Sequence, residues 1–217
     1  MQHIIWDWNG TLLNDTAVIV DAVNDALRPF GNSIALADYR DHYTRPVIRF
    51  YERVLSRALG PDEWQAIDDG FHGAYRARTA LARLTDDCLR ALDHIDQQGG
   101  SQSLLSMLRE PDLMQGLHQH GLTRRFLHID GLREGAGAQK APYLAKHIER
   151  LSARSDLCGD RSRWVLIGDS LDDAKAAAAN DLRCVLFDGG SHHRRELERA
   201  GVPVASTLME ALKQAGL

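Results

Sequence analysis

The sequence lacks a long apolar run and any cysteine arrangement typical of disulfides or metal sites. No stretch reaches the roughly 18 apolar residues of a membrane-spanning helix, and no basic-then-apolar leader indicates a signal peptide. The three cysteines, Cys88, Cys158 and Cys184, are odd in number and far apart, without CxxC or Cys/His ligand spacing. We therefore expect free thiols in a reducing compartment and a cytoplasmic location.

The chain also has little excess charge of either sign. Its net charge is −4, from 26 basic and 30 acidic residues. This imbalance is too small to indicate a nucleic-acid or membrane-surface partner. The 217 residues, 44% of them hydrophobic, suffice for one sizeable core or for a core with a small lobe. We expect a globular protein whose partner is a small molecule, and the sequence does not indicate its oligomeric state.

Short apolar runs alternate with helical patterns along most of the chain. The runs typical of buried parallel strands are His3–Trp6, Gln102–Met107, Phe126–Ile129, Trp164–Ile167 and Arg183–Phe187, with Val202–Ala205 as a candidate sixth. Helical patterns occupy Asp86–Gln98, Pro111–His120, Ala141–Leu151 and Asp172–Asn180. This alternation predicts an α/β fold with a doubly wound, Rossmann-like parallel sheet. Reactive groups of such sheets lie at the carboxyl ends of the strands.

Residues 14–84 interrupt the alternation. They contain only helical patterns, at Thr16–Phe30, Pro46–Leu59 and Pro61–Leu84. This insertion is far longer than the dozen or so residues that a crossover between parallel strands needs. We therefore predict a helical cap domain at 14–84, with 1–13 and 85–217 forming the α/β core.

A set of polar residues falls at the ends of the predicted strands or just before a helix. In chain order these are Asp7, Asn9, Ser106, Lys140, Asp169, Asp172 and Asp173. Asp7 and Asp169 offer hard oxygen ligands suited to Mg²⁺. Ser106 can donate to a phosphate oxygen, and Lys140 can pair with Asp7 and with phosphate as a point charge. Such a set supplies the positioning and charge stabilisation that phosphoryl transfer needs. The alternative for each residue is a structural role, such as the helix N-terminal charge that we favour for Asp172.

In this order the residues resemble the motifs of the haloacid dehalogenase (HAD) superfamily, in its phosphatase branch with a helical cap after the first motif, as in phosphoglycolate phosphatases. The family pattern is Asp-x-Asp-Gly-Thr, then Ser/Thr, then Lys, then Gly-Asp-x-x-x-Asp. The matching residues are Asp7, Gly10, Thr11, Ser106, Lys140, Gly168, Asp169 and Asp173. The resemblance covers the whole chain, including the place and size of the cap.

The resemblance implies a Mg²⁺-dependent phosphatase that hydrolyses a small phosphorylated metabolite through an aspartyl-phosphate on Asp7. The implied metal ligands are Asp7, the backbone carbonyl of Asn9 and Asp169, with Asp173 or Asp172 behind them. The implied phosphate contacts are Trp8, Gly10, Thr11, Ser106 and Lys140. In the cap, Arg45 and Arg49 are candidates for substrate specificity, although a solvated helix face is an equal alternative for each.

Two other branches of the superfamily fit less well. The branch that cleaves carbon–halogen bonds lacks the acidic fourth motif, which Asp169 and Asp173 provide here. The branch that cleaves phosphonates needs a Schiff-base lysine in its cap. All four lysines of this chain, Lys140, Lys146, Lys175 and Lys213, lie outside 14–84.

Asn9 departs from the family pattern. Family members usually carry an aspartate there, which protonates the leaving group and later activates water. An amide does neither, and loss of general acid–base help typically costs about 10²–10⁴-fold in rate. Three interpretations stay open: substrates with good leaving groups such as acyl phosphates or activated esters, another proton donor, or vestigial activity. The alternative function is therefore a catalytically weak or inactive phosphate-binding or regulatory protein of the same fold.

Overall fold

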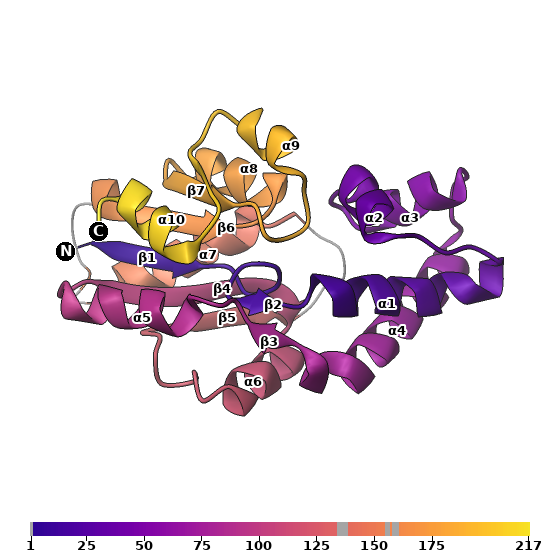
Figure 1. Ribbon diagram of the computed structural model, residues 1–217, viewed down its shortest axis with the longest axis horizontal. Coiled ribbons are helices and arrows are strands. Elements are labelled where there is room, and N and C mark those ends of the chain that lie inside the picture. Colours follow the sequence, from indigo (N-terminus) through magenta and orange to yellow (C-terminus); the bar gives the residue numbers. More distant parts are fainter. Residues whose placement is uncertain (1, 134–138, 155–156, 158–160) are drawn as a thin grey trace.

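The computed structural model describes residues 2–133, 139–154, 157 and 161–217, and within them a six-stranded parallel sheet forms the centre of the molecule (Figure 1). Its strands, in spatial order, are β5 (Ile129–Leu132), β4 (Ser101–Arg109), β1 (His3–Trp6), β6 (Trp164–Gly168), β7 (Arg183–Phe187) and β8 (Val204–Ala205). Every neighbouring pair is parallel. The predicted α/β class is confirmed.

Helices cover both faces of this sheet, because successive strand residues point to opposite sides. Ile4 packs with one hydrophobic cluster and Ile5 with the other. The first cluster includes α5 (Cys88–Gln97), α6 (Glu110–Gln119) and α10 (Leu208–Ala215). The second includes α7 (Ala141–Ser152), α8 (Leu171–Ala179) and α9 (Arg194–Glu198). A 3₁₀ turn at Arg161–Arg163 precedes β6.

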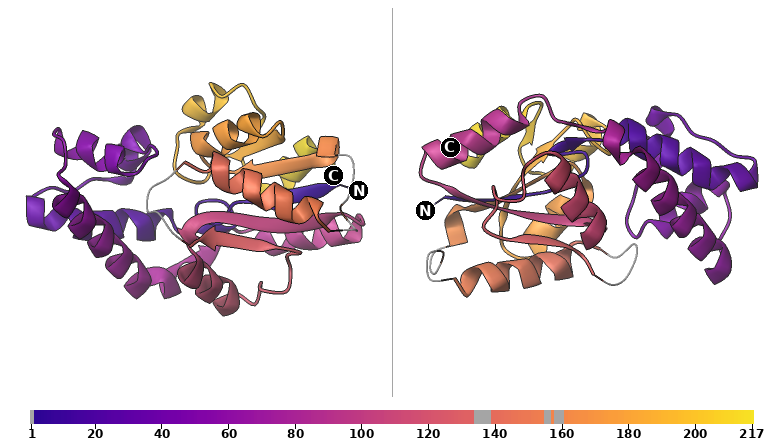
Figure 2. Two further views of the ribbon diagram at one scale, coloured as in Figure 1. Left: turned by 180° about the vertical axis from the view of Figure 1, so that it is seen from behind. Right: turned by 90° about the horizontal axis from the view of Figure 1, so that it is seen from below.

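The helical region lies beyond the carboxyl ends of the strands (Figures 1 and 2). It consists of α1 (Thr16–Leu27), α2 (Leu36–His42), α3 (Ile48–Leu55) and α4 (Pro61–Arg78), with 3₁₀ turns at Arg28–Phe30 and Thr79–Leu81. Its own hydrophobic cluster is built around the buried side chains of Val23, Leu27, Phe50 and Ile67. The sequence did not predict α2.

A two-stranded antiparallel ribbon joins this helical region to the sheet. It pairs β2 (Leu13–Asn14) with β3 (Arg83–Leu84), where the chain leaves the core and where it returns. Two-residue strands carry no periodic pattern, so they could not be predicted from the sequence. The predicted boundaries at 14 and 84 fall in this ribbon, and we keep 14–84 as our proposal for the cap.

One strand is displaced from its predicted position. The apolar run Phe126–Ile129 predicted a strand, whereas β5 covers Ile129–Leu132. The chain already follows β4 before β5 begins, since the N–H of Leu127 bonds the carbonyl of Gln102 at 2.8 Å. Phe126 is buried in the core without being in a strand. An apolar run thus marked burial rather than regular pairing.

Two of the three cysteines lie in the described residues. Cys88 and Cys184 are free and buried. Cys158 lies outside the described residues. Within the part of the chain that the structure describes, we find no helix whose length and apolar content would let it span a bilayer.

Two leucines on α5 test how far the core extends. Leu92 is fully buried, whereas Leu89 is 52% exposed. Leu92→Ala should lower the free energy of unfolding by about 2–5 kcal/mol, because it leaves a cavity against the sheet. Leu89→Ala, the matched control on the same helix, should change it by less than about 0.5 kcal/mol. Urea unfolding measures both, and equal losses would contradict this packing.

Candidate active site

The first strand delivers a carboxylate to the edge of the sheet. Asp7 follows β1, and its N–H bonds the carbonyl of Ile167 on β6 at 2.9 Å. The chain then turns at Gly10, which has a φ of 72°. A Cβ at Gly10 would lie 2.5 Å from Oδ2 of Asp169. Only glycine combines this left-handed conformation with so close an approach.

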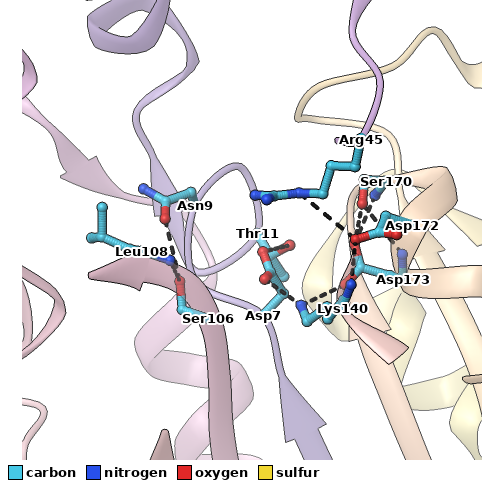
Figure 3. Close-up of polar contacts among 10 residues, drawn as sticks. All are labelled: Asp7, Asn9, Thr11, Arg45, Ser106, Leu108, Lys140, Ser170, Asp172 and Asp173. Carbon is cyan, nitrogen blue, oxygen red and sulfur yellow. Dashed lines mark hydrogen bonds and ion pairs between the residues drawn. The ribbon is translucent and has the colours of Figure 1, made fainter. Parts of the chain in front are cut away.

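Lys140 binds two of the carboxylates. Its Nζ lies 2.5 Å from Oδ1 of Asp7 and 2.5 Å from Oδ1 of Asp173, and its side chain is 2% exposed (Figure 3). Burial lowers the pKa of Lys140, but the charges of Asp173 and Asp7 outweigh it and raise the pKa above the ordinary value. Lys140 in turn holds the pKa of Asp173 low despite burial. The ammonium is therefore a fixed positive charge.

Asp169 is the carboxylate that this ammonium does not bind. Its Oδ2 accepts a hydrogen bond from the N–H of Ser191 at 2.6 Å, and the residue is 3% exposed. Burial, together with the charges of Asp7 and Asp173, raises the pKa of Asp169 to about 8. Burial also raises the pKa of Asp7 to about 6, against the pull of Lys140. Three carboxylates around one ammonium leave an excess of negative charge, and hard oxygens with that excess fit a divalent cation.

The two acidic residues at the start of α8 face different partners. Oδ2 of Asp173 accepts from the N–H and hydroxyl of Ser170, which completes a capping box, while Oδ1 faces Lys140. Oδ2 of Asp172 accepts from the N–H of Lys140 at 2.9 Å and lies 3.7 Å from Nε of Arg45. Asp173 is thus tied to the carboxylate cluster, and Asp172 to the helical region.

The amide of Asn9 is held in one orientation. Its Nδ2 donates to Oδ2 of Asp15 at 2.6 Å and to the hydroxyl of Tyr75 at 2.8 Å. The Tyr75 hydroxyl donates to the same Asp15 oxygen at 2.7 Å, and the N–H of Gly10 donates to the other at 2.9 Å. A carboxylate accepts hydrogen bonds, so the amide must turn its nitrogen toward Asp15. Its Oδ1 then faces the hydroxyl of Ser106, 3.4 Å away.

Sequence reasoning missed both partners of this amide. Asp15 is only six positions beyond Asn9 and directly precedes a predicted helix, but the sequence analysis assigned it no role. Tyr75 comes from α4, at a sequence distance of 60 residues from Asp15. Nothing in the sequence connects these positions, because the contact depends on how α4 returns to the sheet.

A cavity of about 470 Å³ opens above these groups, between the sheet edge and the helical region. Seven of the predicted residues line it, namely Asp7, Asn9, Arg45, Ser106, Lys140, Asp169 and Asp173. Asp172 lines it as well. The set that the sequence placed at strand ends is therefore brought together, joined by one arginine of the helical region.

Other predicted residues lie elsewhere. Arg49 sits on an exposed part of α3 and pairs with Glu52 at 2.7 Å, away from the residues that line the cavity. The Trp8 side chain is buried beside Gly116 of α6. Thr11 is buried as well, and its hydroxyl donates to Oδ2 of Asp7 at 3.3 Å.

The buried excess charge should make the metal-free chain sensitive to pH. The folded pKa of Asp169, about 8, exceeds the ordinary 3.8, so this group's stabilisation is complete below about pH 4. It is lost as the pH rises through 8, by up to about 1.4 kcal/mol per pH unit. Asp169→Asn should flatten this decline and be more stable than wild type at pH 8.5 in EDTA.

Urea unfolding in EDTA between pH 5 and 9 measures this difference. Asp93→Asn, on the exposed surface of α5, serves as the matched control and should keep the wild-type dependence. Parallel curves for wild type and Asp169→Asn would show that this carboxylate carries no excess charge in the folded chain.

Comparisons with known proteins agree with the fold. A family model described as haloacid dehalogenase-like hydrolase matches residues 4–187. The phosphoglycolate phosphatase of Synechococcus elongatus is 27% identical over 99% of this chain and 98% of its own length. The tyrosine-protein kinase PtkA of Mycobacterium tuberculosis is 24% identical over all of this chain and 73% of its own length.

Solved structures show the same architecture. The crystal structure of a hydrolase from Pseudomonas syringae superposes with a TM-score of 0.80 at 17% identity, covering 98% of this chain and 97% of that one. At this identity the likeness establishes the fold alone. The family match spans β1 through β7 and includes every strand end that carries a site residue, and so the chain belongs to the haloacid dehalogenase-like hydrolases.

Proposed function

We propose that this hydrolase is a Mg²⁺-dependent phosphatase of a small phosphorylated metabolite, with Asp7 as the nucleophile. The observation that carries the proposal is the buried ammonium of Lys140, bound to Asp7 and Asp173 beside the carboxylate of Asp169. Structural carboxylates are rarely buried in such number around one cation, because each costs several kcal/mol to desolvate. A phosphoryl-transfer site needs this concentration of fixed charge.

Each residue has a separate task in this proposal. Lys140 holds Oδ1 of Asp7 and leaves Oδ2, which accepts a longer bond from Thr11, to attack phosphorus. The attack forms an aspartyl-phosphate and releases the alcohol; water then cleaves it and frees phosphate. Ser106 lines the cavity beside Asn9 and can donate to a phosphate oxygen. Of the three turn residues expected to contact phosphate, Gly10 and Thr11 already donate their backbone N–H groups, to Asp15 and to the carbonyl of Trp8, so Trp8 is the one that we propose to offer its own.

The carboxylates fit the metal that the family resemblance implies. Asp7 and Asp169 would hold Mg²⁺ together with the backbone carbonyl of Asn9. Asp173 would act behind them, since both of its oxygens already accept hydrogen bonds. The bound ion would neutralise the excess charge and polarise the phosphate.

Arg45 is our candidate for substrate recognition. It lines the cavity and comes from the segment between α2 and α3, within 3.7 Å of Asp172. Its guanidinium can donate two parallel hydrogen bonds to an anionic group, and it carries its charge at any physiological pH. The exposed position of Arg49 leaves it without such a role.

Hydrolysis is the direction of transfer that we favour. The curated relatives include a phosphatase and a protein kinase, both of which handle phosphoryl groups. The match covers 98% of the phosphatase and 73% of the kinase. The alternative of a weak phosphate-binding protein has one supporting observation, the amide at Asn9.

Turnover of 4-nitrophenyl phosphate tests the proposal. Wild type should release 4-nitrophenolate with Mg²⁺ and lose this activity in EDTA. Asp7→Asn should fall by at least about 10³-fold at unchanged stability, because it removes the nucleophile. Asp93→Asn, on the exposed surface of α5, should match wild type. Equal rates in wild type and Asp7→Asn would leave the phosphate-binding alternative, in which the chain binds inorganic phosphate without turnover.

A further inference from the structure

Within the described part of the cavity wall, the position beside the nucleophile offers the substrate an acceptor and no proton. The hydrogens of the Asn9 amide are donated to Asp15 and Tyr75, and the Tyr75 hydroxyl donates to Asp15. Asn9 and Ser106 lie on the side of Asp7 that is away from Lys140 (Figure 3). A departing alkoxide would therefore meet the Asn9 carbonyl oxygen, which has no proton to transfer.

Three of the other polar side chains around the site are poor acids near neutral pH, whereas Asp169, with a pKa raised to about 8, is an acid that the experiment has to exclude. The guanidinium of Arg45 does not release its protons. Lys140 is held charged by Asp173 and Asp7. Burial raises the pKa of Tyr43 to about 12. His72 also lines the cavity, and its Nε2 lies 3.5 Å from Asp68. His72 is therefore also a side chain that the experiment has to exclude as the proton donor.

Leaving groups differ widely in how much they need a proton. A phenol has a pKa of about 10, as tyrosine does, and departs readily as its anion. An aliphatic alcohol is close to water, with a pKa of about 16, and its departure requires protonation. An active site without a proton donor is therefore suited to esters of phenols.

The cavity wall independently favours an aromatic body. Six aromatic side chains of the helical region line it: Tyr39, Tyr43, Phe50, Tyr51, Phe71 and Tyr75. They pack on one another, with Phe71 and Tyr75 stacked at 5.9 Å and Tyr43 and Phe50 at 6.4 Å between ring centroids. A further ring can join such a group edge-to-face or offset-stacked. The volume of about 470 Å³ accommodates a substrate with a single ring.

From these two observations we infer that the substrate is a phosphate monoester of a phenol. The phosphate lies between Asp7, Lys140 and Arg45, and the ring lies against the aromatic wall. Asp7 attacks phosphorus, the ester P–O bond breaks, and the phenolate carries away the electron pair without being protonated by the protein. This inference rests on the proposed phosphatase function.

Three phosphate esters of similar size distinguish the effect of the leaving group from the effect of an aromatic ring. Phenyl phosphate has a ring and a good leaving group, benzyl phosphate has a ring and a poor leaving group, and cyclohexyl phosphate has neither ring nor good leaving group. We expect kcat/KM, which reports the attack on the ester and not the later hydrolysis of the shared aspartyl-phosphate, to be at least about 10²-fold higher for phenyl phosphate than for the other two. KM for phenyl and benzyl phosphate should be similar, and that for cyclohexyl phosphate higher.

The outcomes distinguish failure of this substrate inference from failure of the proposed phosphatase function. If all three esters are hydrolysed equally and Asp7 is required, a donor such as His72 supplies the proton, and the inference is wrong while the phosphatase stands. If none is hydrolysed and Asp7→Asn changes nothing, the phosphatase proposal itself has failed. A lower KM for cyclohexyl phosphate than for both aromatic esters would contradict the aromatic wall as the binding surface.

A double variant exchanges the amide and the carboxylate. Asn9→Asp alone would place two carboxyl groups at the present 2.6 Å contact with Asp15, so we pair it with Asp15→Asn. The pair restores a carboxyl group at position 9 and should raise kcat for benzyl phosphate by at least about 10-fold, with little gain for phenyl phosphate. Asp15→Asn alone is the control and should show no such gain. An unchanged ratio of the two esters in a folded double variant would overturn the inference.

Discussion

The site depends on one buried ion contact, in which the ammonium of Lys140 lies between the carboxylates of Asp7 and Asp173. The three residues come from separate segments, after β1, before α7 and in the first turn of α8. The parallel pairing of β1 with β6 places the first and last of these segments at one edge. Removing the ammonium would leave these carboxylates buried without their cation, so the contact fixes the arrangement as well as the charge.

The ammonium of Lys140 binds Asp7 and Asp173 but not the third carboxylate, Asp169. Asp169 lies beside Asp7 in the same buried pocket, and its pKa is raised first by burial and then by the negative charges of Asp7 and Asp173. Glycines at 10 and 190 allow the backbone to close around this carboxylate, since a Cβ at either would collide with it. Packing so close around an unbalanced charge lowers stability unless a cation arrives. The proposed metal binding and the cost to the metal-free fold would thus be two consequences of one arrangement.

Much of this arrangement could be predicted because Asp7 and Asp169 directly follow apolar strands, Lys140 directly precedes a helix, and parallel strands end at one edge. The remainder depends on the path of the chain between elements. Arg45 and Arg49 are four residues apart, yet one lines the cavity and the other lies on the exposed part of α3. The shifted β5 shows the same limit, because an apolar run reports burial and not hydrogen bonding.

The amide at Asn9 is best understood together with Asp15 and not as an isolated loss. Their side chains are 2.6 Å apart, and two carboxylates at that distance could not both be ionised. A carboxylate at one position therefore favours an amide at the other, and Tyr75 binds both. Because Tyr75 belongs to α4, this arrangement also links the helical region to the turn after β1. Position 9 thus holds a rigid contact in place of a proton donor, and under the proposed function the leaving group would have to depart without a proton from this side chain.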